Sequence, residues 1–411
     1  MRAIIGLLCS AILTLSGYAQ VDPLGQVLDQ MPDSLRTLVD RPEEHQVQIM
    51  YTRIDRDEDN RPLFTTFTHG LDTSRYFYPA STVKLPTALL ALEKLNHLRI
   101  IGLDRETPMY TGTGRPPQQG VAADSSAATG LPSVAHYIKK IFLVSDNEAY
   151  NRLYEFLGQA ALNEKLHARG FESSRIIHRL SAPQFDSIDN RYTNPVLFRR
   201  SDTLLYFQGE VFSRADAELD LQDQIRGKGY IDREGKLIKA PFDFRHKNHL
   251  SLPDLHDILK VVLFPESASE KQRFDLSRSD YEFVYRYMSM LPRESDEPAY
   301  PQYQNWDGFV KFLLYGDTRD PIPDHIRIFN KVGDAYGFLT DAAYVVDFKN
   351  GVEFILAASV HVNENQIFND GVYEYDDLGF PFLATLGRLI YAYELQRERK
   401  VSPDLSRFDL H

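Results

Sequence analysis

The sequence predicts an α/β (α+β) fold in which an antiparallel sheet flanked by helices joins a mostly helical lobe. Three observations lead to this prediction. Alternating apolar patterns near both ends of the chain are typical of paired strands, patterns with helical spacing fill the middle, and an amphipathic helix closes the chain. With 411 residues, 43% of them hydrophobic, the chain can bury one large core or two lobes.

The first residues differ in kind from the rest. Met1-Arg2 is followed by an apolar run too brief to span a bilayer, and Gly17-Tyr18-Ala19 supplies small residues at the two positions that a signal peptidase reads. We therefore expect residues 1–19 to be a cleaved signal peptide and the protein to be periplasmic or secreted. Cys9, the one cysteine, lies inside this run, so the mature chain would hold no disulfide or thiolate site. No other run approaches transmembrane length.

Acidic residues outnumber basic ones by 58 to 46, which gives a formal net charge of −12. This balance argues against nucleic acid and anionic membrane surfaces as partners. We expect a soluble monomer without a membrane span.

The elements follow in order along the chain. A helical pattern over residues 22–40 precedes two alternating segments, 45–54 and 61–70, which a charged turn joins into a hairpin. The segment from Ser81 to Asn96 is predicted to be helical, with leucines recurring on one side at positions 85, 89, 92 and 95. After a Gly- and Pro-rich loop, helices are predicted at 134–144, 148–158, 159–170 and 251–264, with Ser133 and Ser251 as N-caps and Gly158 as a terminator.

Residues 181–250 lack clear periodicity and are interpreted as a long excursion with small elements of its own. Beyond them, residues 341–348 and 352–362 are predicted to form a hairpin around Lys349-Asn-Gly351, a strong turn signal. Residues 380–400 form the terminal amphipathic helix.

Three short motifs carry the chemistry: Ser81-Thr-Val-Lys84, Ser145-Asp-Asn147 and Lys331-Val-Gly333. Residues three apart on a helix share one face, so the lysine amine of the first motif can reach the serine hydroxyl. A serine is a poor nucleophile until a base takes its proton. A lysine is such a base only when burial or a neighbouring cation lowers its pKa.

Each motif has a plainer interpretation by itself. A serine followed three residues later by a lysine occurs roughly once by chance in a chain of this length. Ser81 would then be a helix-start hydroxyl, Lys84 a solvated charge, the second motif an N-cap, and the third a turn before a strand. The three motifs together, in this order and in matching contexts, are far more specific than any one of them.

The motifs resemble those of the active-site serine penicillin-recognising family, whose class A β-lactamases and penicillin-binding proteins carry S-x-x-K, S-D-N and K-T-G. The flanks "FYPASTVK" and "KVGDAYGFLTDAAYVV" are similar to the family's as well, and the likeness spans roughly residues 24–180 and 250–398. The resemblance implies a β-lactamase/transpeptidase-like fold. Its α/β lobe would be residues 20–80 and 331–411, and its mostly helical lobe residues 81–330, including an insertion at about 181–250.

The resemblance also implies roles for individual residues. Ser81 would be the acylated nucleophile, Lys84 its activating partner, and Ser145 the relay that passes the proton toward the leaving group. No metal and no cofactor is implied. The substrate would be a small molecule or a peptidoglycan-derived fragment.

Four further residues would bind the substrate. Asn147 would hold a substrate amide together with Lys84, and Lys331 would hold Ser145 and supply positive potential. Gly333 would permit close backbone approach. The oxyanion hole would consist of the backbone N–H groups of Ser81 and Asp334.

Two departures from the family's pattern bear on the reaction. The family's class A enzymes use a glutamate in the loop after the second motif to activate the deacylating water, but residues 173–209 contain none. Asp186 or Asp189 could substitute. Val332 stands where the family has a threonine or serine. We expect this position to face the cleft, where the family's hydroxyl holds a substrate carboxylate. Arg327 could compensate for the missing hydroxyl by binding that carboxylate.

The expected function is therefore that of an exported class A β-lactamase-like serine hydrolase. The alternatives are a D-alanyl-D-alanine carboxypeptidase or esterase on the same fold, and a penicillin-binding or sensor module that turns over slowly. His246 and His249 have ligand-like spacing, but without acidic or histidine partners nearby we expect a surface role for both.

Overall fold

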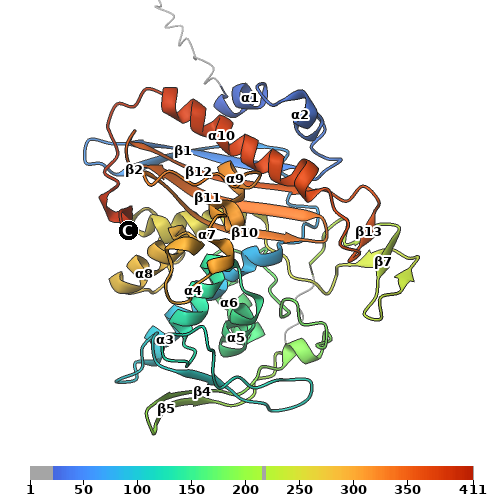
Figure 1. Ribbon diagram of the computed structural model, residues 1–411, viewed down its shortest axis with the longest axis vertical. Helices are drawn as coiled ribbons and strands as arrows, with labels where there is room; N and C mark the ends of the chain where they lie inside the picture. The colour runs from blue at the N-terminus through green and yellow to red at the C-terminus, as the bar shows by residue number, and fades with distance from the viewer. Residues whose placement is uncertain (1–21, 215–218, 411) are drawn as a thin grey trace, which may run out of the picture.

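The computed structural model describes residues 22–214 and 219–410, so the predicted signal peptide lies outside the described residues. A five-stranded antiparallel sheet runs through the molecule in the order β10-β11-β12-β1-β2 (Figure 1). Its strands are β1 (Gln48–Arg56), β2 (Pro62–His69), β10 (Ile326–Ala335), β11 (Phe338–Asp347) and β12 (Val352–His361). Both predicted hairpins are present, β1–β2 and β11–β12. The predicted fold class is confirmed.

The two ends of the chain meet in this sheet. β1 pairs with β12, with Gln48 opposite Ser359, and so lies between its hairpin partner β2 and the C-terminal strands. β11 and β12 are buried along their whole length, because helices cover both faces of the sheet. β10 forms one edge of the sheet, so one side of this strand has no strand partner.

One face of the sheet carries the N-terminal and C-terminal helices (Figure 1). They are α1 (Pro23–Leu28), α2 (Asp33–Asp40), α9 (Phe312–Tyr315) and α10 (Phe380–Gln396). The predicted first helix is split, because Pro32 is extended at ψ 147° and ends the α1 segment before α2 begins. An apolar core fills the space between these helices and the sheet.

The other face carries the middle of the chain. Its helices are α3 (Lys84–Leu98), α4 (Val134–Val144), α5 (Asn147–Leu157), α6 (Gln159–Ala168), α7 (Leu252–Leu263) and α8 (Arg278–Ser289). Ser133 and Ser251 cap α4 and α7 as predicted, and Gly158 ends α5. The predicted helix is present but begins at Lys84 rather than Ser81, and Ala88, Leu90 and Ala91 are buried as well as the four leucines. α3 is a central helix enclosed by its neighbours.

Short strands account for much of the excursion. They are β4 (Val196–Arg200), β5 (Thr203–Gln208), β6 (Ile225–Arg226), β7 (Gly229–Ile231), β8 (Leu237–Ile238) and β9 (Phe242–Asp243). Two short strands from outside the excursion pair with it, β3 (Met109–Thr111) with β4 and β13 (Ile367–Phe368) with β7. Single turns complete the structure: η1 (Ala80–Val83), η2 (Asp189–Arg191), η3 (Pro265–Ser267), η4 (Pro292–Glu294), η5 (Pro301–Tyr303), η6 (Asp307–Val310), η7 (Tyr375–Gly379) and η8 (Ser406–Phe408). No helix within residues 22–214 and 219–410 combines the length and apolarity needed to cross a membrane.

Candidate active site

The first motif occupies a tight turn that leads directly into α3. Ser81 lies in the 3₁₀ turn η1, and Lys84 is the first residue of the α-helix. Ala80, immediately before the serine, has φ of 45°, a conformation that costs a non-glycine residue free energy and marks a constrained turn. Thr82 Oγ1 donates a hydrogen bond of 2.7 Å to the Pro79 carbonyl and fixes the turn from within. The side chain of Ser81 is thereby presented at the helix start.

Lys84 is fully buried and lies at the centre of the site. Its Nζ is 2.7 Å from Ser81 Oγ and 2.7 Å from Asn147 Oδ1, and it also donates to the Ser145 carbonyl. Burial removes water from the ammonium group and lowers the pKa of Lys84 well below its usual value, and the nearby Lys331 cation lowers it further. A neutral lysine amine, hydrogen-bonded to a serine hydroxyl, has a lone pair that can accept the proton of that hydroxyl.

The second motif is the junction between α4 and α5. Ser145 ends α4 in the left-handed conformation, with φ of 55°, and Asp146 caps α5 by accepting from Ala149 N at 2.8 Å. This sharp reversal turns the side chains of Ser145 and Asn147 back toward Lys84, with Ser145 Oγ 3.3 Å from Lys84 Nζ. The second motif therefore serves both as a helix cap and as part of the site, because Asp146 caps α5 while Ser145 and Asn147 contact Lys84.

The third motif lies on the free edge of the sheet. Lys331 Nζ donates to Ser145 Oγ at 2.8 Å and to the Val332 carbonyl at 2.9 Å. Burial lowers the pKa of Lys331 to about 7. A Cβ on Gly333 would lie 2.5 Å from the Pro79 carbonyl oxygen and 2.9 Å from Ser81 N, so only glycine allows β10 to press against the nucleophile turn. The structure thus brings all three motifs together.

Asp334 follows Gly333 and is exposed to solvent. Two residues earlier in β10, the carbonyl oxygen of Val332 accepts a hydrogen bond from Lys331 Nζ and points away from β11. The N–H and C=O of one strand residue point to the same side of the strand, and this direction recurs at every second residue. The Asp334 N–H therefore points outward from the same edge as the Val332 carbonyl. Partial desolvation raises the pKa of the Asp334 carboxyl, an effect that Lys331 and then Lys84 oppose.

A loop that sequence reasoning missed completes the surroundings of Lys84. Ser181 Oγ accepts a hydrogen bond of 2.8 Å from Asn147 Nδ2. The loop is held by the buried ion pair of Arg179 with Glu155, at 2.8 Å between Nε and Oε1. A single exposed serine in an irregular segment carries no sequence signal. Its position becomes meaningful only when the loop is folded against α5.

Neither aspartate proposed as a substitute for the missing glutamate reaches the site. Asp186 Oδ1 accepts the backbone N–H groups of Ile188 and Asp189 at 2.8 Å each, and Asp189 Oδ2 accepts the Asp186 N–H at 3.2 Å. In the described part of the chain, no hydrogen bond joins either carboxylate to Ser81, Lys84 or Asn147. These side chains stabilise their own turn.

Three further expectations are corrected by the structure. Val332 does not face the cleft, because its side chain is 2% exposed within the apolar core on the α10 side of the sheet. Arg327 is not free to bind a carboxylate, because it is paired with Glu294 at 2.8 Å. His249 is not on the surface; it is buried, and its Nδ1 contacts the Phe77 carbonyl at 3.2 Å.

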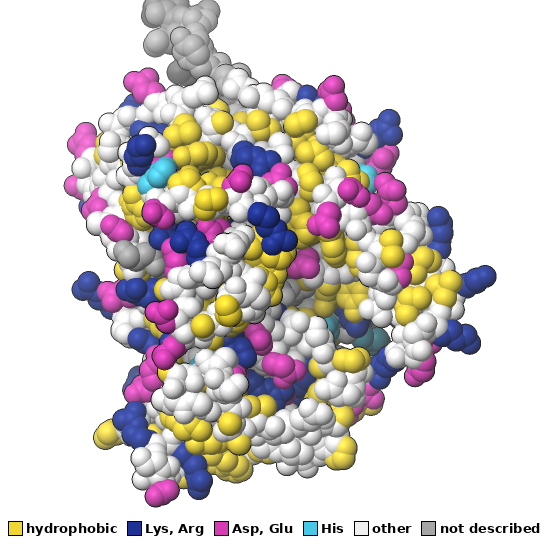
Figure 2. Space-filling model, viewed as in Figure 1, with side chains coloured by type: hydrophobic (Ala, Val, Ile, Leu, Met, Phe, Trp, Pro, Cys, Tyr) yellow, Lys and Arg dark blue, Asp and Glu magenta, His cyan; other side chains and the backbone are white. Residues whose placement is uncertain are grey.

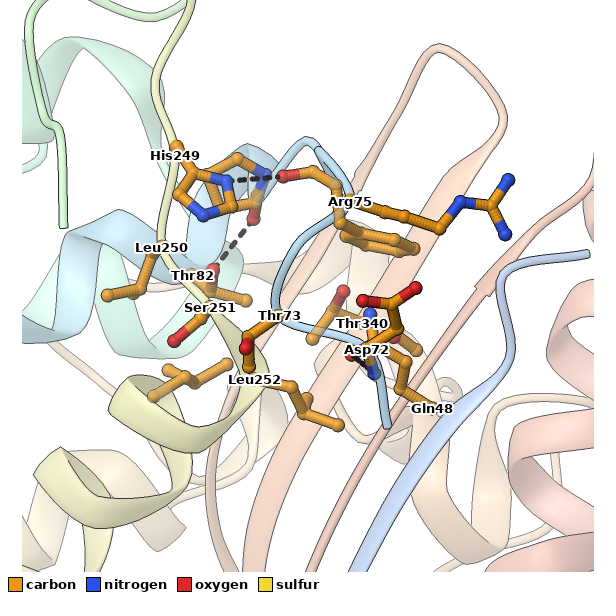
Figure 3. A pocket seen from close by; sticks show the side chains of 14 residues that line it. Gln48, Asp72, Thr73, Arg75, Thr82, His249, Leu250, Ser251, Leu252 and Thr340 are labelled. Atoms are coloured by element: carbon orange, nitrogen blue, oxygen red, sulfur yellow. Dashed lines mark hydrogen bonds between the residues drawn. The ribbon is translucent and has the colours of Figure 1, made fainter. Parts of the chain in front are cut away.

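A small pocket is lined in part by Pro79 and Thr82 of the nucleophile turn (Figure 3). Thr340, Ser359 and Gln48 stand side by side across β11, β12 and β1, and Thr82 and His249 contribute to the opposite wall. About 10 Å³ is accessible to the centre of a water-sized sphere, which is room for about one water molecule. This pocket is too small for a substrate.

A cluster of mostly buried aromatic rings packs beside the nucleophile turn. Tyr78 packs edge-on against Tyr336, with ring centroids 5.2 Å apart, and Phe244 contacts both. Lys247 lies over the Tyr336 ring at 5.9 Å. The surface on this side is hollowed between the projection that carries β7 and the helical part of the molecule (Figures 1 and 2). The excursion and the C-terminal segment form this projection together, because β7 pairs with β13.

Comparison with known proteins agrees with this geometry. Residues 33–223, somewhat less than half of the chain, match the model of the "Beta-lactamase enzyme family". This match includes the first two motifs and confirms the resemblance to the active-site serine penicillin-recognising family. No curated protein matches the chain.

Solved structures with a similar course of the chain include β-lactamases and a penicillin-binding protein. A β-lactamase from Desulfarculus baarsii is 12% identical, with 91% of this chain and 98% of that chain covered and a TM-score of 0.46. PBP-A is 16% identical, with 90% and 94% covered and a TM-score of 0.48. A β-lactamase from Chitinophaga pinensis is 12% identical, with 90% and 97% covered and a TM-score of 0.48. At these identities and scores the likenesses carry no inference about activity.

Proposed function

Because residues 33–223 match the β-lactamase enzyme family and Ser81 is hydrogen-bonded to a buried lysine, we propose that the protein is a serine hydrolase that acts through an acyl-enzyme on Ser81. The observation that carries the proposal is the 2.7 Å contact between Lys84 Nζ and Ser81 Oγ inside a desolvated site. The pKa of Lys84 is lowered in the direction that a general base at neutral pH requires.

In the proposed acylation, neutral Lys84 removes the proton of Ser81 as Oγ attacks the substrate carbonyl. The backbone N–H groups of Ser81 and Asp334 stabilise the oxyanion, a contribution that is typically worth several kcal/mol. Ser145, held between Lys84 and Lys331, returns a proton to the leaving group as the bond to the carbonyl carbon breaks. Asn147 fixes Lys84 and offers its amide to the substrate.

Deacylation is the step for which the site is less well equipped. In β-lactamase-like catalysis a water must be activated to cleave the Ser81 ester, and the group beside Asn147 is the hydroxyl of Ser181 rather than a carboxylate. This observation favours a second candidate, a penicillin-binding module that acylates quickly and turns over slowly. The carboxypeptidase and esterase alternatives share the same first step.

The proposal extends to the protein's location and its lobes. The N-terminal segment 1–19 supports export to the periplasm or beyond, with removal of the signal peptide. The substrate would enter between an α/β lobe of residues 20–80 and 331–411 and a helical lobe of residues 81–330. N-terminal sequencing of the protein recovered from the periplasm tests the cleavage site.

Intact-mass spectrometry after incubation with a penicillin tests the main proposal. We expect an adduct of the mass of the intact penicillin on the wild-type protein and none on Ser81→Ala. An adduct that persists for hours identifies a penicillin-binding module, whereas a transient adduct with hydrolysed product identifies a β-lactamase. A folded Ser81→Ala protein that still became labelled would overturn the role of Ser81.

A serine-reactive fluorophosphonate covers the esterase alternative. It needs only an activated serine and no β-lactam recognition. It should therefore label Ser81 whether the protein is a β-lactamase, a penicillin-binding module, a carboxypeptidase or an esterase. If neither reagent modifies Ser81 in the folded wild-type protein, the proposed function fails. Comparison of the melting curves of wild type and Ser81→Ala controls for folding.

A further inference from the structure

Lys247 presents an amine without a protein partner beside the candidate site. The residue is partly buried, with Nζ 5.9 Å from the centre of the Tyr336 ring and 5.6 Å from the centre of the Phe242 ring. Within residues 22–214 and 219–410, this Nζ has no hydrogen bond and no ion pair. The nearby cation Arg245 differs, because it is paired with Asp243 at 2.7 Å. The three N–H donors of Lys247 are therefore left for solvent or for a ligand.

The backbone beside Lys247 is fixed to the loop that leads to Ser181. The next residue, Asn248, is fully buried, and its Oδ1 accepts the backbone N–H groups of Ile177 and His178 at 2.8 and 3.1 Å. Ser181 follows three residues after His178 in the same loop. The base of the Lys247 side chain is thereby held in place against this loop, while its amine stays free.

Ring contacts link Lys247 to the nucleophile turn as well. The Tyr336 ring packs edge-on against Tyr78, with centroids 5.2 Å apart, and Tyr78 leads directly into that turn. The Tyr78 ring also stacks parallel to the His178 ring at 6.3 Å. Burial lowers the pKa of His178 to about 3, and the nearby charge of Lys247 lowers it further. The amine thus lies where the nucleophile turn, the end of β10 and the Ser181 loop meet.

The contacts of Lys84 divide the site into two sides. Ser145 and Lys331, which serve the leaving group in the proposed acylation, lie on one side. Asn147 accepts from the Lys84 amine with Oδ1 and donates to Ser181 with Nδ2, so its amide lies between Lys84 and the Ser181 loop. An acyl group extends from the carbonyl carbon away from the leaving group, which is toward Asn147 and this loop. The free amine beside the loop therefore lies on the acyl side of the site.

We propose that Lys247 is a specificity-determining residue that binds a carboxylate carried by the acyl part of the substrate. The inference rests on the proposed acyl transfer at Ser81 and names the class of acyl donor that the site prefers. A carboxylate would accept a charge-assisted hydrogen bond from the amine, and the partly exposed Tyr336 ring offers apolar contact beside it. Lysine suits this role, because it carries a compact charge on a flexible stem.

Three penicillins that share the same leaving-group side test the proposal. Benzylpenicillin has an uncharged benzyl side chain, carbenicillin carries a carboxylate on the same benzylic carbon, and ampicillin carries an amine there. In each reaction the Ser81 Oγ–C bond forms, the C–N bond of the β-lactam ring breaks, and the proton of Ser81 passes to the ring nitrogen. The second-order rate constant of acylation is measured from the growth of the adduct. It is then divided by the rate constant for alkaline hydrolysis of the same penicillin.

We expect the corrected rate constant of carbenicillin to exceed that of benzylpenicillin by roughly tenfold or more at low ionic strength, with ampicillin the slowest. The formal net charge of −12 would by itself favour the opposite order, because the protein as a whole repels the more anionic penicillin. A preference for carbenicillin therefore reports a local cation. Added salt should reduce this preference, because it screens the two charges.

Variants assign the preference to one residue. Lys247→Met removes the charge but keeps much of the length of the side chain, and it should bring the ratio of carbenicillin to benzylpenicillin close to one. Lys247→Arg keeps the charge and should retain a ratio above one. Lys236→Met makes the same change as the first variant at an exposed position between β7 and β8, and it should leave the ratio unchanged. Melting curves of all four proteins control for folding.

The outcomes separate this inference from the function on which it rests. If neither the fluorophosphonate nor a penicillin modifies Ser81, the proposed function fails. If the fluorophosphonate labels Ser81 but carbenicillin acylates it no faster than benzylpenicillin, or neither penicillin reacts, the inference about Lys247 fails alone. A preference that survives in folded Lys247→Met would also overturn it. Lys247→Gln serves as the second uncharged variant if Lys247→Met does not fold.

Discussion

Lys331 Nζ lies 2.8 Å from Ser145 Oγ, although the two residues are 186 positions apart in the chain. The contact joins the edge of the sheet to the turn between α4 and α5. Because Lys84 also contacts Ser145, one hydroxyl lies between two buried amines with lowered pKa values. Such an arrangement can pass a proton from one group to the next.

Removing this hydroxyl should slow acylation without preventing it. We expect Ser145→Ala to lower the rate constant for acylation of Ser81 by about 10²- to 10⁴-fold, the usual contribution of a positioned proton-transfer group. Stopped-flow measurement with a chromogenic β-lactam checks this value. Ser74→Ala, which removes a surface hydroxyl bonded to Asp72, is the matched control. Equal rates for both variants would remove Ser145 from the proton path.

The buried lysines predict a dependence of stability on pH. Burial lowers the pKa of both Lys331 and Lys311 to about 7, against about 10.5 in the unfolded chain. Between these values the unfolded state binds protons that the folded state has released. The free energy of unfolding should therefore rise with pH from about 7 toward 10, by up to about 1.4 kcal/mol per pH unit for each group.

Urea denaturation at pH 7, 8 and 9 measures this slope. Lys311→Met, which removes one of the two groups, should show a smaller slope whatever its absolute stability. A free energy of unfolding that stays flat or falls over this range in the wild type would show that these lysines keep their protons when folded.

The Ser181 hydroxyl predicts slow deacylation. A chromogenic β-lactam should give a burst of product equal to one equivalent of protein, followed by a slower steady rate. Ser181→Glu places a carboxylate beside Asn147, where it can accept a proton from water, and should raise the deacylation rate constant by roughly tenfold or more. Ser181→Gln has nearly the same shape without the basic group and should not. A gain in both variants would point to a steric effect of the longer side chain.

Val332→Thr should weaken the fold rather than improve substrate binding. The hydroxyl would enter the apolar core between the sheet and α10, which typically costs about 1–3 kcal/mol without a hydrogen-bond partner. Val372→Thr makes the same chemical change at an exposed position and should alter stability by less than about 0.5 kcal/mol. A higher kcat/KM for carboxylate-bearing substrates in Val332→Thr would mean that the side chain turns toward the cleft after all.

Much of the architecture could be predicted because it is encoded locally. The i, i+3 spacing of Ser81 and Lys84 and the turn signal at Lys349-Asn-Gly351 each depend on a few neighbouring residues. The orientation of Val332 could not be read in this way, because it depends on which face of β10 meets α10. The same is true of α3, which looks amphipathic in isolation and is buried on nearly all sides because helices from both directions enclose it.

The surroundings of the site were the least predictable part. Ser181 reaches Asn147 through a loop fixed by Arg179 and Glu155, a contact between segments with no sequence periodicity. A surface role was expected for His249 because no acidic or histidine partner lies near it in the sequence, yet Tyr76 and the Phe77 carbonyl enclose it. Contacts of this kind depend on the tertiary arrangement and leave no local pattern.

The pairing of β1 with β12 has a consequence for how the chain reaches this structure. Gln48 meets Ser359 only after more than three hundred intervening residues have been synthesised, so the centre of the sheet is the last part to close. Contacts between such distant residues slow folding, because the entropy of closing the loop is lost before the pairing stabilises it. A chain synthesised only as far as α8 can form its helices, but it lacks Lys331 and the strands β10, β11 and β12. A truncation immediately before β12 would leave all three motifs in the chain but remove the central strand, to which β10 and Lys331 are joined through β11.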